Sequence, residues 1–215
     1  MTIRDVYGFV EQGIQKIHVK YKDETIIFVS PSKGPGTYTG VMKALRKDKL
    51  LMPTTAQTIL LFAYAMQNKD EPVCASIVSR FESKYTHLWT CTENLYEKGG
   101  VYLYDNPDGK LNVKDKAGLD SHPARFVKYG FKQENKSFSD FVENPYILAQ
   151  VDGDPNIAQM IVEIAKSYNK NLNISTHSSA SGKKHSALLS HLSSRELVVC
   201  GRRGGGNGCV FGVLE

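Results

Sequence analysis

The chain has 215 residues, of which 41% are hydrophobic and 23% are charged, and this composition excludes disordered and fibrous proteins. Its length suffices for one domain or for a larger and a smaller lobe, and no apolar run approaches the roughly 18 residues that a membrane-spanning helix needs. The 27 basic and 22 acidic residues give a net charge of +5, which permits an anionic partner without requiring one.

Residues 1 to 145 are predicted to combine helices with a small sheet. The first segment is ambiguous, because the apolar residues from Val6 to Ile17 have helical spacing whereas those from Ile17 to Tyr21 alternate as in a strand. The segment TIIFVS (25–30) predicts a strand, and PSKGPGTYTG (31–40) predicts a turn-rich loop. A strand followed by a polar turn is therefore expected before residue 41.

Two helices are expected next, followed by a pair of strands. The segment 54–68 opens with a capping box formed by Thr54 and Gln57 and continues as an apolar run typical of a buried helix. Pro72 begins a second helix, whose apolar residues repeat at helical spacing. The segment 89–105 predicts strands joined by a turn at residues 98–100.

From residue 146 onwards, strands and helices are predicted to alternate. The expected strands are YILAQV (146–151), LNIST (172–176), ELVVC (196–200) and CVFGVL (209–214), and the expected helices are 155–168, capped by Asp154, and HSALLSHL (185–192). This β-α-β-α-β-β order is typical of a mixed sheet, with parallel strands and a last strand that returns as an antiparallel edge. The fold class is therefore α+β or α/β. Regions 1–145 and 146–215 form either two units or one continuous domain.

Polar loops are expected at the carboxyl ends of the parallel strands, where proteins with such sheets bind ligands. Three loops, 152–154, 175–184 and 201–208, would then meet at one edge. Arginine forks and glycine amides suit phosphate oxygens. The residues predicted to bind a phosphate-bearing ligand are Ser181, Lys183, Lys184, Arg202, Arg203, Gly204, Gly205 and Gly206.

The same loops contain residues suited to metal-assisted catalysis. Asp152 and Asp154 are candidate Mg²⁺ ligands, and His177 or His185 is a candidate general acid or base. Each feature also has a simpler interpretation: Asp154 caps a helix, the histidines are solvated, and the glycines supply the positive φ angles of a hairpin tip. The sequence does not decide whether the protein is an enzyme.

Two further patterns concern nucleic-acid binding and the cellular compartment of the protein. RFVKYGFK (125–132) interleaves basic and aromatic residues, as RNA-binding sheets do, although packing of the aromatic rings in the core is the favoured interpretation. Trp89 is likewise expected in the core. Cys200 and Cys209 flank the glycine loop and face each other if it is a hairpin, but we favour free thiols in a cytoplasmic protein.

The sequence therefore supports three hypotheses of different classes. The first is a protein that binds a nucleotide or a nucleic-acid backbone at the C-terminal loops without chemistry. The second is a metal-dependent phosphoesterase or nuclease at the same place, with Mg²⁺ as its cofactor. The third is a protein-interaction protein whose glycine loop binds no ligand. No membrane partner is expected, and the oligomeric state is open.

Overall fold

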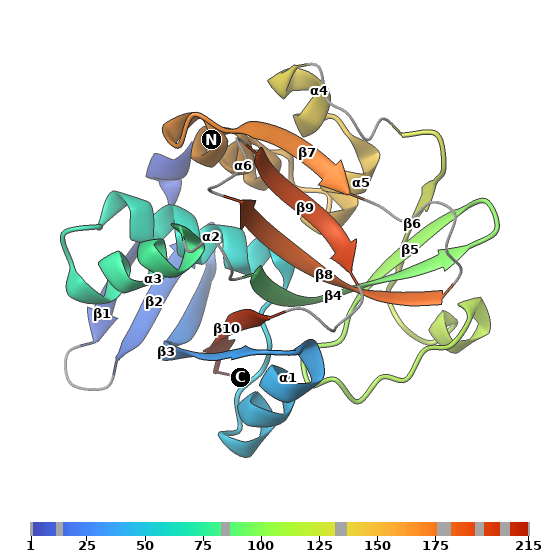
Figure 1. The fold of residues 1–215 in the computed structure, drawn as a ribbon, viewed down its shortest axis with the longest axis horizontal. Helices are drawn as coiled ribbons and strands as arrows, with labels where there is room; N and C mark the ends of the chain where they lie inside the picture. Colours follow the sequence, from blue (N-terminus) through green and yellow to red (C-terminus); the bar gives the residue numbers. More distant parts are fainter. Residues whose placement is uncertain are drawn as a thin grey trace.

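The structure is a computed structural model that describes residues 2–11, 15–82, 87–131, 137–175, 182–191, 196–202 and 207–214, with the backbone alone described at 175, 182–191, 196 and 200–202. Its helices and strands form an α+β fold with a mixed sheet (Figure 1). The strands are β1 (Tyr7–Glu11), β2 (Lys16–Tyr21), β3 (Glu24–Gly36), β4 (His87–Glu97), β5 (Gly100–Asp105), β6 (Arg125–Lys128), β7 (Asn171–Ser175), β8 (Gly182–His191), β9 (Glu196–Arg202) and β10 (Gly208–Val213). The helices are α1 (Tyr38–Lys47), α2 (Thr55–Gln67), α3 (Pro72–Glu82), α4 (Phe138–Val142), α5 (Pro145–Gln150) and α6 (Pro155–Ser167), with short 3-10 turns at Ile3–Asp5 and Lys116–Leu119.

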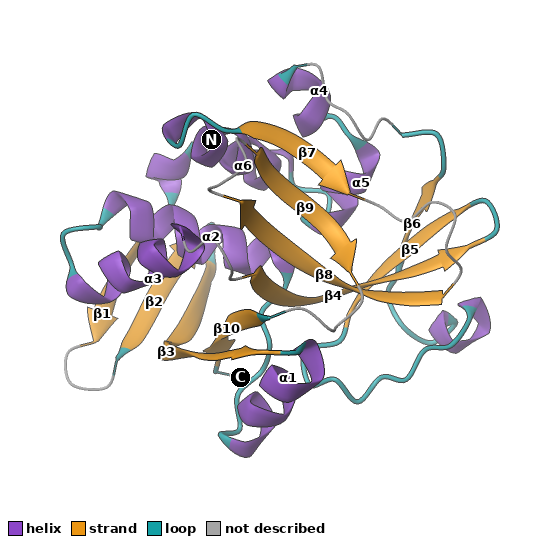
Figure 2. Cartoon of the chain, in the orientation of Figure 1, coloured by secondary structure: helices purple, strands orange, loops and turns teal. Residues whose placement is uncertain are grey.

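The strands of both halves of the chain join one sheet in the order β1-β2-β3-β10-β4-β8-β9-β7, and β5 and β6 extend it from β4 (Figure 2). Most neighbouring strands are antiparallel, and the pairs β4 with β10 and β7 with β9 are parallel. The main hydrophobic core also draws its residues from both halves, from Val6 to Val213.

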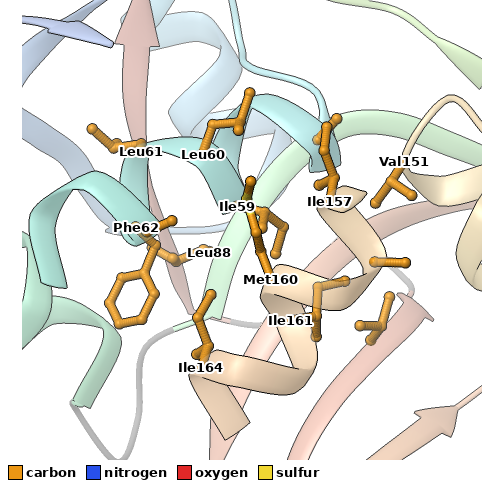
Figure 3. Packing of buried hydrophobic residues seen from close by; sticks show 14 of the residues in the cluster. Ile59, Leu60, Leu61, Phe62, Leu88, Val151, Ile157, Met160, Ile161 and Ile164 are labelled. Atoms are coloured by element: carbon orange, nitrogen blue, oxygen red, sulfur yellow. The ribbon is translucent and has the colours of Figure 1, made fainter. Parts of the chain in front are cut away.

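Alternation along β4 divides the sheet into two faces. Leu88 joins the main core with α2 and α6, where Ile59 and Ile161 are fully buried (Figure 3). Trp89 and Cys91 point to the opposite face and pack with residues of α1 in a second cluster. Trp89 is fully buried, so its expected place in the core is confirmed.

Several elements form as the sequence predicts. The Thr54 hydroxyl accepts from the Gln57 amide and the Gln57 side chain accepts from the Thr54 amide, which confirms the capping box of α2. Asp154 caps α6, with Pro155 at its first position. Helix α3 begins at Pro72, and β4 and β5 flank the turn at 98–100. Residues 16–21 are strand β2 and not helix.

Two predicted elements of the second half are wrong. Residues 145–150 form helix α5 and not a strand, because Asn144 caps the helix and Pro145 occupies its first turn. Residues 182–191 form strand β8 and not a helix, because their backbone pairs with β4 on one side and with β9 on the other. Partners on both sides outweigh the weak helical preference of a short apolar run.

The order of the C-terminal strands also differs from the prediction. Strand β10 is not an antiparallel edge: it lies inside the sheet, antiparallel to β3 and parallel to β4. Strand β3 continues to Gly36, so most of the expected loop at 31–40 is strand, with irregular pairing to β10 that accommodates its prolines. Strands β9 and β10 are separated by β4 and β8, so no hairpin joins Cys200 to Cys209.

The aromatic segment at 125–132 is only partly in the core. Val127 is buried and Phe131 stacks on Tyr146 at a centroid distance of 5.2 Å. The Phe126 side chain is 51% exposed, so the expected core packing is wrong for this ring. It lies across Gly100 and against Tyr102, where a glycine leaves room for an aromatic ring on the strand surface.

Candidate functional site

The predicted anion-binding residues are only partly within the described chain. Arg202 is the last residue of β9, and Lys183, Lys184 and His185 lie in β8. His177, Ser181, Arg203 and Gly204, Gly205 and Gly206 lie outside the described residues. The predicted convergence of the three loops is only partly present. The loop 152–154 follows helix α5 and not a strand, but β7 and β9 are parallel neighbours, so the strand ends that precede the other two loops lie at the same edge of the sheet. Phosphate binding by the glycine loop stays a prediction.

Asp154 is held between a helix end and two side chains. Its carboxylate accepts from the Asn156 amide at 2.9 Å, the Tyr21 hydroxyl at 2.8 Å and the Lys22 ammonium at 2.7 Å. Burial opposes ionisation, but the hydrogen bonds from Lys22 and Tyr21 outweigh it and lower the pKa of this carboxyl group. The helix-capping interpretation of Asp154 is therefore confirmed.

Asp152 pairs with a different cation. Its backbone is in the left-handed region, with φ of 56°, and its carboxylate pairs with the Arg125 guanidinium, which also contacts Asp105 at 3.1 Å. Asp152 and Asp154 both line a cavity of about 510 Å³ beside Tyr21 and Lys22. Within the described residues, no three His, Cys, Asp or Glu side chains gather closely enough to hold a metal ion. The Mg²⁺ role of the two aspartates stays a prediction.

The centre of the sheet holds a buried carboxylate that sequence reasoning missed. Glu93 of β4 is 1% exposed and lies on the same face as Trp89 and Cys91. Its oxygens accept from the Tyr104 hydroxyl at 2.7 Å, the Tyr38 hydroxyl at 3.3 Å and the Asn106 amide at 3.2 Å. Burying a carboxylate is costly unless donors surround it, and these three donors come from β5, α1 and the segment after β5.

The two tyrosines remain protonated donors. Burial raises the pKa of Tyr38, and the nearby charge of Glu93 raises it further. Burial and the Glu93 charge act in the same direction on the pKa of Tyr104. Both hydroxyls therefore keep their protons at neutral pH, where they donate to the Glu93 carboxylate.

Strand pairing places two of the sequence-predicted residues in the same row as this carboxylate. Tyr104 is the register partner of Glu93 on β5, and His185 is its register partner on β8. Arg202 is in turn the register partner of His185 on β9. The backbone thus aligns Tyr104, Glu93, His185 and Arg202 across four neighbouring strands. The sequence predicted the last two as a proton-transfer residue and a phosphate ligand, but not their alignment with Glu93.

A cavity opens at Glu93. It has a volume of about 470 Å³ and is lined by Tyr38, Thr39, Met42, Lys43, Arg46, Glu93, Asn106 and Gly109. Lys43 and Arg46 are exposed residues of α1, and the Arg46 Nε donates to the Asp108 carbonyl at 2.6 Å. The cavity therefore combines a carboxylate at its buried end with two cationic side chains at its exposed side.

One signal in the sequence indicates the site. In HLWTCTENLYE (87–97), Glu93 is the single charged residue between the ends of a strand that is otherwise apolar or neutral. A charge in the middle of a strand buried on both faces requires partners, so it marks a structural or functional cluster. The partners themselves come from distant segments, which no local pattern connects.

Comparison with known proteins gives this site no assigned role. No protein-family model, no curated protein and no solved structure matches the chain. No helix in the described part of the chain is long and apolar enough to cross a membrane.

Proposed function

We propose that this protein binds a phosphate-bearing small molecule of about nucleotide size in the cavity above Glu93. The proposal rests on the opposite charges at the two ends of this cavity. Lys43 and Arg46 at the exposed side suit phosphate oxygens, and Arg forks are especially suited to them. Glu93 and Asn106 at the buried end suit a hydroxyl or amino group of the same ligand.

The shape and chemistry of the cavity support a small ligand and not a polymer backbone alone. A volume of about 470 Å³ falls within the range of small-molecule sites, which take a few polar groups against an apolar wall. Met42 and Tyr38 supply that wall here. A nucleotide or a sugar phosphate has the required anionic end and the required hydrogen-bond donors.

The alignment of Glu93 with His185 across β4 and β8 favours acid–base chemistry on this ligand as a second candidate function. A buried carboxylate held by fixed donors, next to the strand position of His185, is an arrangement that proton-transfer enzymes use. Glu93 would remove a proton from the ligand group that it contacts, and His185 is the nearest sequence-predicted partner. In this case turnover requires Glu93, whereas phosphate binding does not.

We also place the protein in the cytoplasm. Cys74, Cys91 and Cys209 are free and buried, as expected where disulfides do not form.

The test is thermal melting of the purified protein with nucleoside phosphates, sugar phosphates, inorganic phosphate and unphosphorylated nucleosides, with and without Mg²⁺. A ligand at ~100 times its dissociation constant adds ~2.7 kcal/mol of stability if it binds only the folded state. The proposal predicts a shift that Lys43→Ala abolishes. Lys47→Ala is the matched control, because Lys47 lies on the same helix and does not line the cavity.

The outcome also separates the two candidate functions and the two predicted phosphate sites. A shift retained by Lys43→Ala and lost in the double variant Arg202→Ala, Arg203→Ala assigns the phosphate to the glycine loop instead. A shift retained by Glu93→Gln with loss of turnover supports acid–base catalysis. The absence of any shift with phosphorylated ligands overturns the proposal.

A further inference from the structure

The outer face of the hairpin formed by β1 and β2 carries exposed aromatic rings. Tyr7 is 63% exposed and Phe9 is 58% exposed, which makes them the most exposed of the large hydrophobic side chains described. They are two residues apart on β1, so they share one face of the strand. The inner face is covered, because Ile17 and Val19 of β2 are fully buried in the main core.

These rings are preorganised by the neighbouring strand. Phe9 and His18 are register partners, and their rings stack with a centroid distance of 4.2 Å and an interplanar angle of 10°. Tyr7 is the register partner of Lys20, which is exposed. The hairpin therefore presents flat rings with a cationic chain directly beside them.

The charge of the face is cationic around the rings. Lys16 and Lys20 lie on either side of His18 on the outer side of β2, and Glu11 is the acidic register partner of Lys16 on β1. The Glu11 carboxylate lies 3.2 Å from the His18 Nε2 atom and 3.9 Å from the Lys16 ammonium. Lys20 lies at the other end of the face, beside Tyr7, four register positions away from Glu11.

We propose that this face binds single-stranded nucleic acid, with bases stacked on Tyr7 and Phe9 and the phosphate backbone beside Lys20 and Lys16. Exposed aromatic rings on a sheet, flanked by cations, are the elements that single-stranded nucleic acids require. Two residues along a strand span about 6.8 Å, which lets two unstacked bases of an extended strand each meet one ring. A base paired within a duplex presents no free face to such rings.

This inference does not depend on the proposed function, because the hairpin face and the Glu93 cavity have no residue in common. The alternative occupant is a second copy of the chain, since β1 is the end strand in the order of the sheet. Edge strands readily pair with one another. The cations beside the rings favour the anionic partner over a second copy, which would bring the same cations onto this face.

The test is fluorescence anisotropy with labelled oligouridine RNA, oligothymidine DNA and a DNA duplex, at several salt concentrations. Both single strands should bind more tightly than the duplex, and the ratio of their affinities shows which of the two strands is preferred. Stacking on an aromatic ring predicts that Tyr7→Ala and Phe9→Ala each weaken binding by about 5-fold to 150-fold. Phe9→Trp should retain binding. Lys20→Ala should reduce the salt slope by about 1.

Phe138→Ala is the matched control, because Phe138 is also an exposed aromatic residue but lies on α4 and not on the hairpin. It should bind as the unchanged protein does. Each variant alters an exposed side chain, and its melting curve checks that it folds. The proposal is overturned if the unchanged protein does not bind single strands, if Tyr7→Ala and Phe9→Ala bind normally, or if Phe138→Ala loses binding equally. A dimer in sedimentation that Phe9→Ala abolishes, without oligonucleotide binding, assigns the face to a second copy.

Discussion

The hydroxyl group of Tyr104 donates a 2.7 Å hydrogen bond to the Glu93 carboxylate, which is its direct partner across two antiparallel strands. Because both groups are buried, removing the acceptor leaves the buried Tyr104, Tyr38 and Asn106 donors with one partner fewer. We expect Glu93→Ala to lower the free energy of unfolding by about 3 kcal/mol or more, measured by urea denaturation. Glu93→Gln, which keeps an acceptor, should cost clearly less.

Tyr104→Phe tests the same contact from the donor side. It removes one hydrogen bond to a charged acceptor and should cost about 2 kcal/mol. Tyr102→Phe is the matched control, because Tyr102 lies two residues away on the same strand and is half-buried. Loss of the Tyr102 hydroxyl group should change the free energy of unfolding by less than about 0.5 kcal/mol. Equal costs for the two variants would contradict the assigned role of Glu93.

Asp154 should make the stability of the fold depend on pH. Its pKa is lowered in the folded protein, so it stabilises the fold above its unfolded pKa of about 3.9, and this contribution disappears as the pH falls through the lower folded value. Asp154→Asn retains a capping acceptor but not the charge. The melting temperature of Asp154→Asn should therefore be lower than that of the unchanged protein at neutral pH and should approach it in acid. A constant difference at every pH would exclude the charge effect.

The buried thiols should resist alkylation. Burial raises the pKa of Cys74 and of Cys209 to about 11 each, and it raises the pKa of Cys91 as well. Only the thiolate reacts, so native protein at about pH 8 should remain unmodified at these three positions when treated with N-ethylmaleimide. Peptide mass spectrometry identifies the modified cysteines, and the same treatment in urea provides full labelling. Rapid labelling of Cys209 in the native state would contradict its buried position in β10.

Gly208 is required by packing against the single tryptophan. A β-carbon at this position would collide with the Trp89 indole ring, whose Nε1 atom donates to the Gly36 carbonyl at 3.2 Å. We expect Gly208→Ala to cost about 1 to 3 kcal/mol and to change the Trp89 fluorescence. Gly36→Ala is the matched control at the paired register position, where a β-carbon makes ordinary contact with Val41. It should leave stability nearly unchanged.

Local signals in the sequence predict the elements that have their own start and stop residues. The Thr54 and Gln57 capping box predicts α2, and Asp154 with Pro155 predicts α6. The short apolar runs at 146–151 and 185–192 are read incorrectly, because their length fits either a helix or a strand and their partners are distant in sequence. In the first run, Asn144 and Pro145 form a helix start, and this start determines that the run is a helix and not a strand.

The candidate site is predicted less well than the fold. His185 and Arg202 are singled out by residue type, but Glu93 is not, because its role depends on donors brought together from α1, β5 and residue 106. The glycines of the segment 201–208 are ambiguous for the same reason, because the role of a glycine can depend on residues that are distant in the sequence. Gly208 at the end of the glycine-rich segment is explained by contact with Trp89, a residue more than 100 positions earlier in the sequence.

The position of β10 between β3 and β4 affects how the chain folds during synthesis. In the order of the sheet, β1, β2 and β3 reach β4 only through β10, which follows every other described strand in the sequence. Until residues 208–213 leave the ribosome, β3 and β4 each present an edge with unpaired amide and carbonyl groups. Such edges pair readily with other chains, so the nascent protein is exposed to aggregation until β10 is inserted. Formation of this sheet therefore requires synthesis of the chain at least through residue 213.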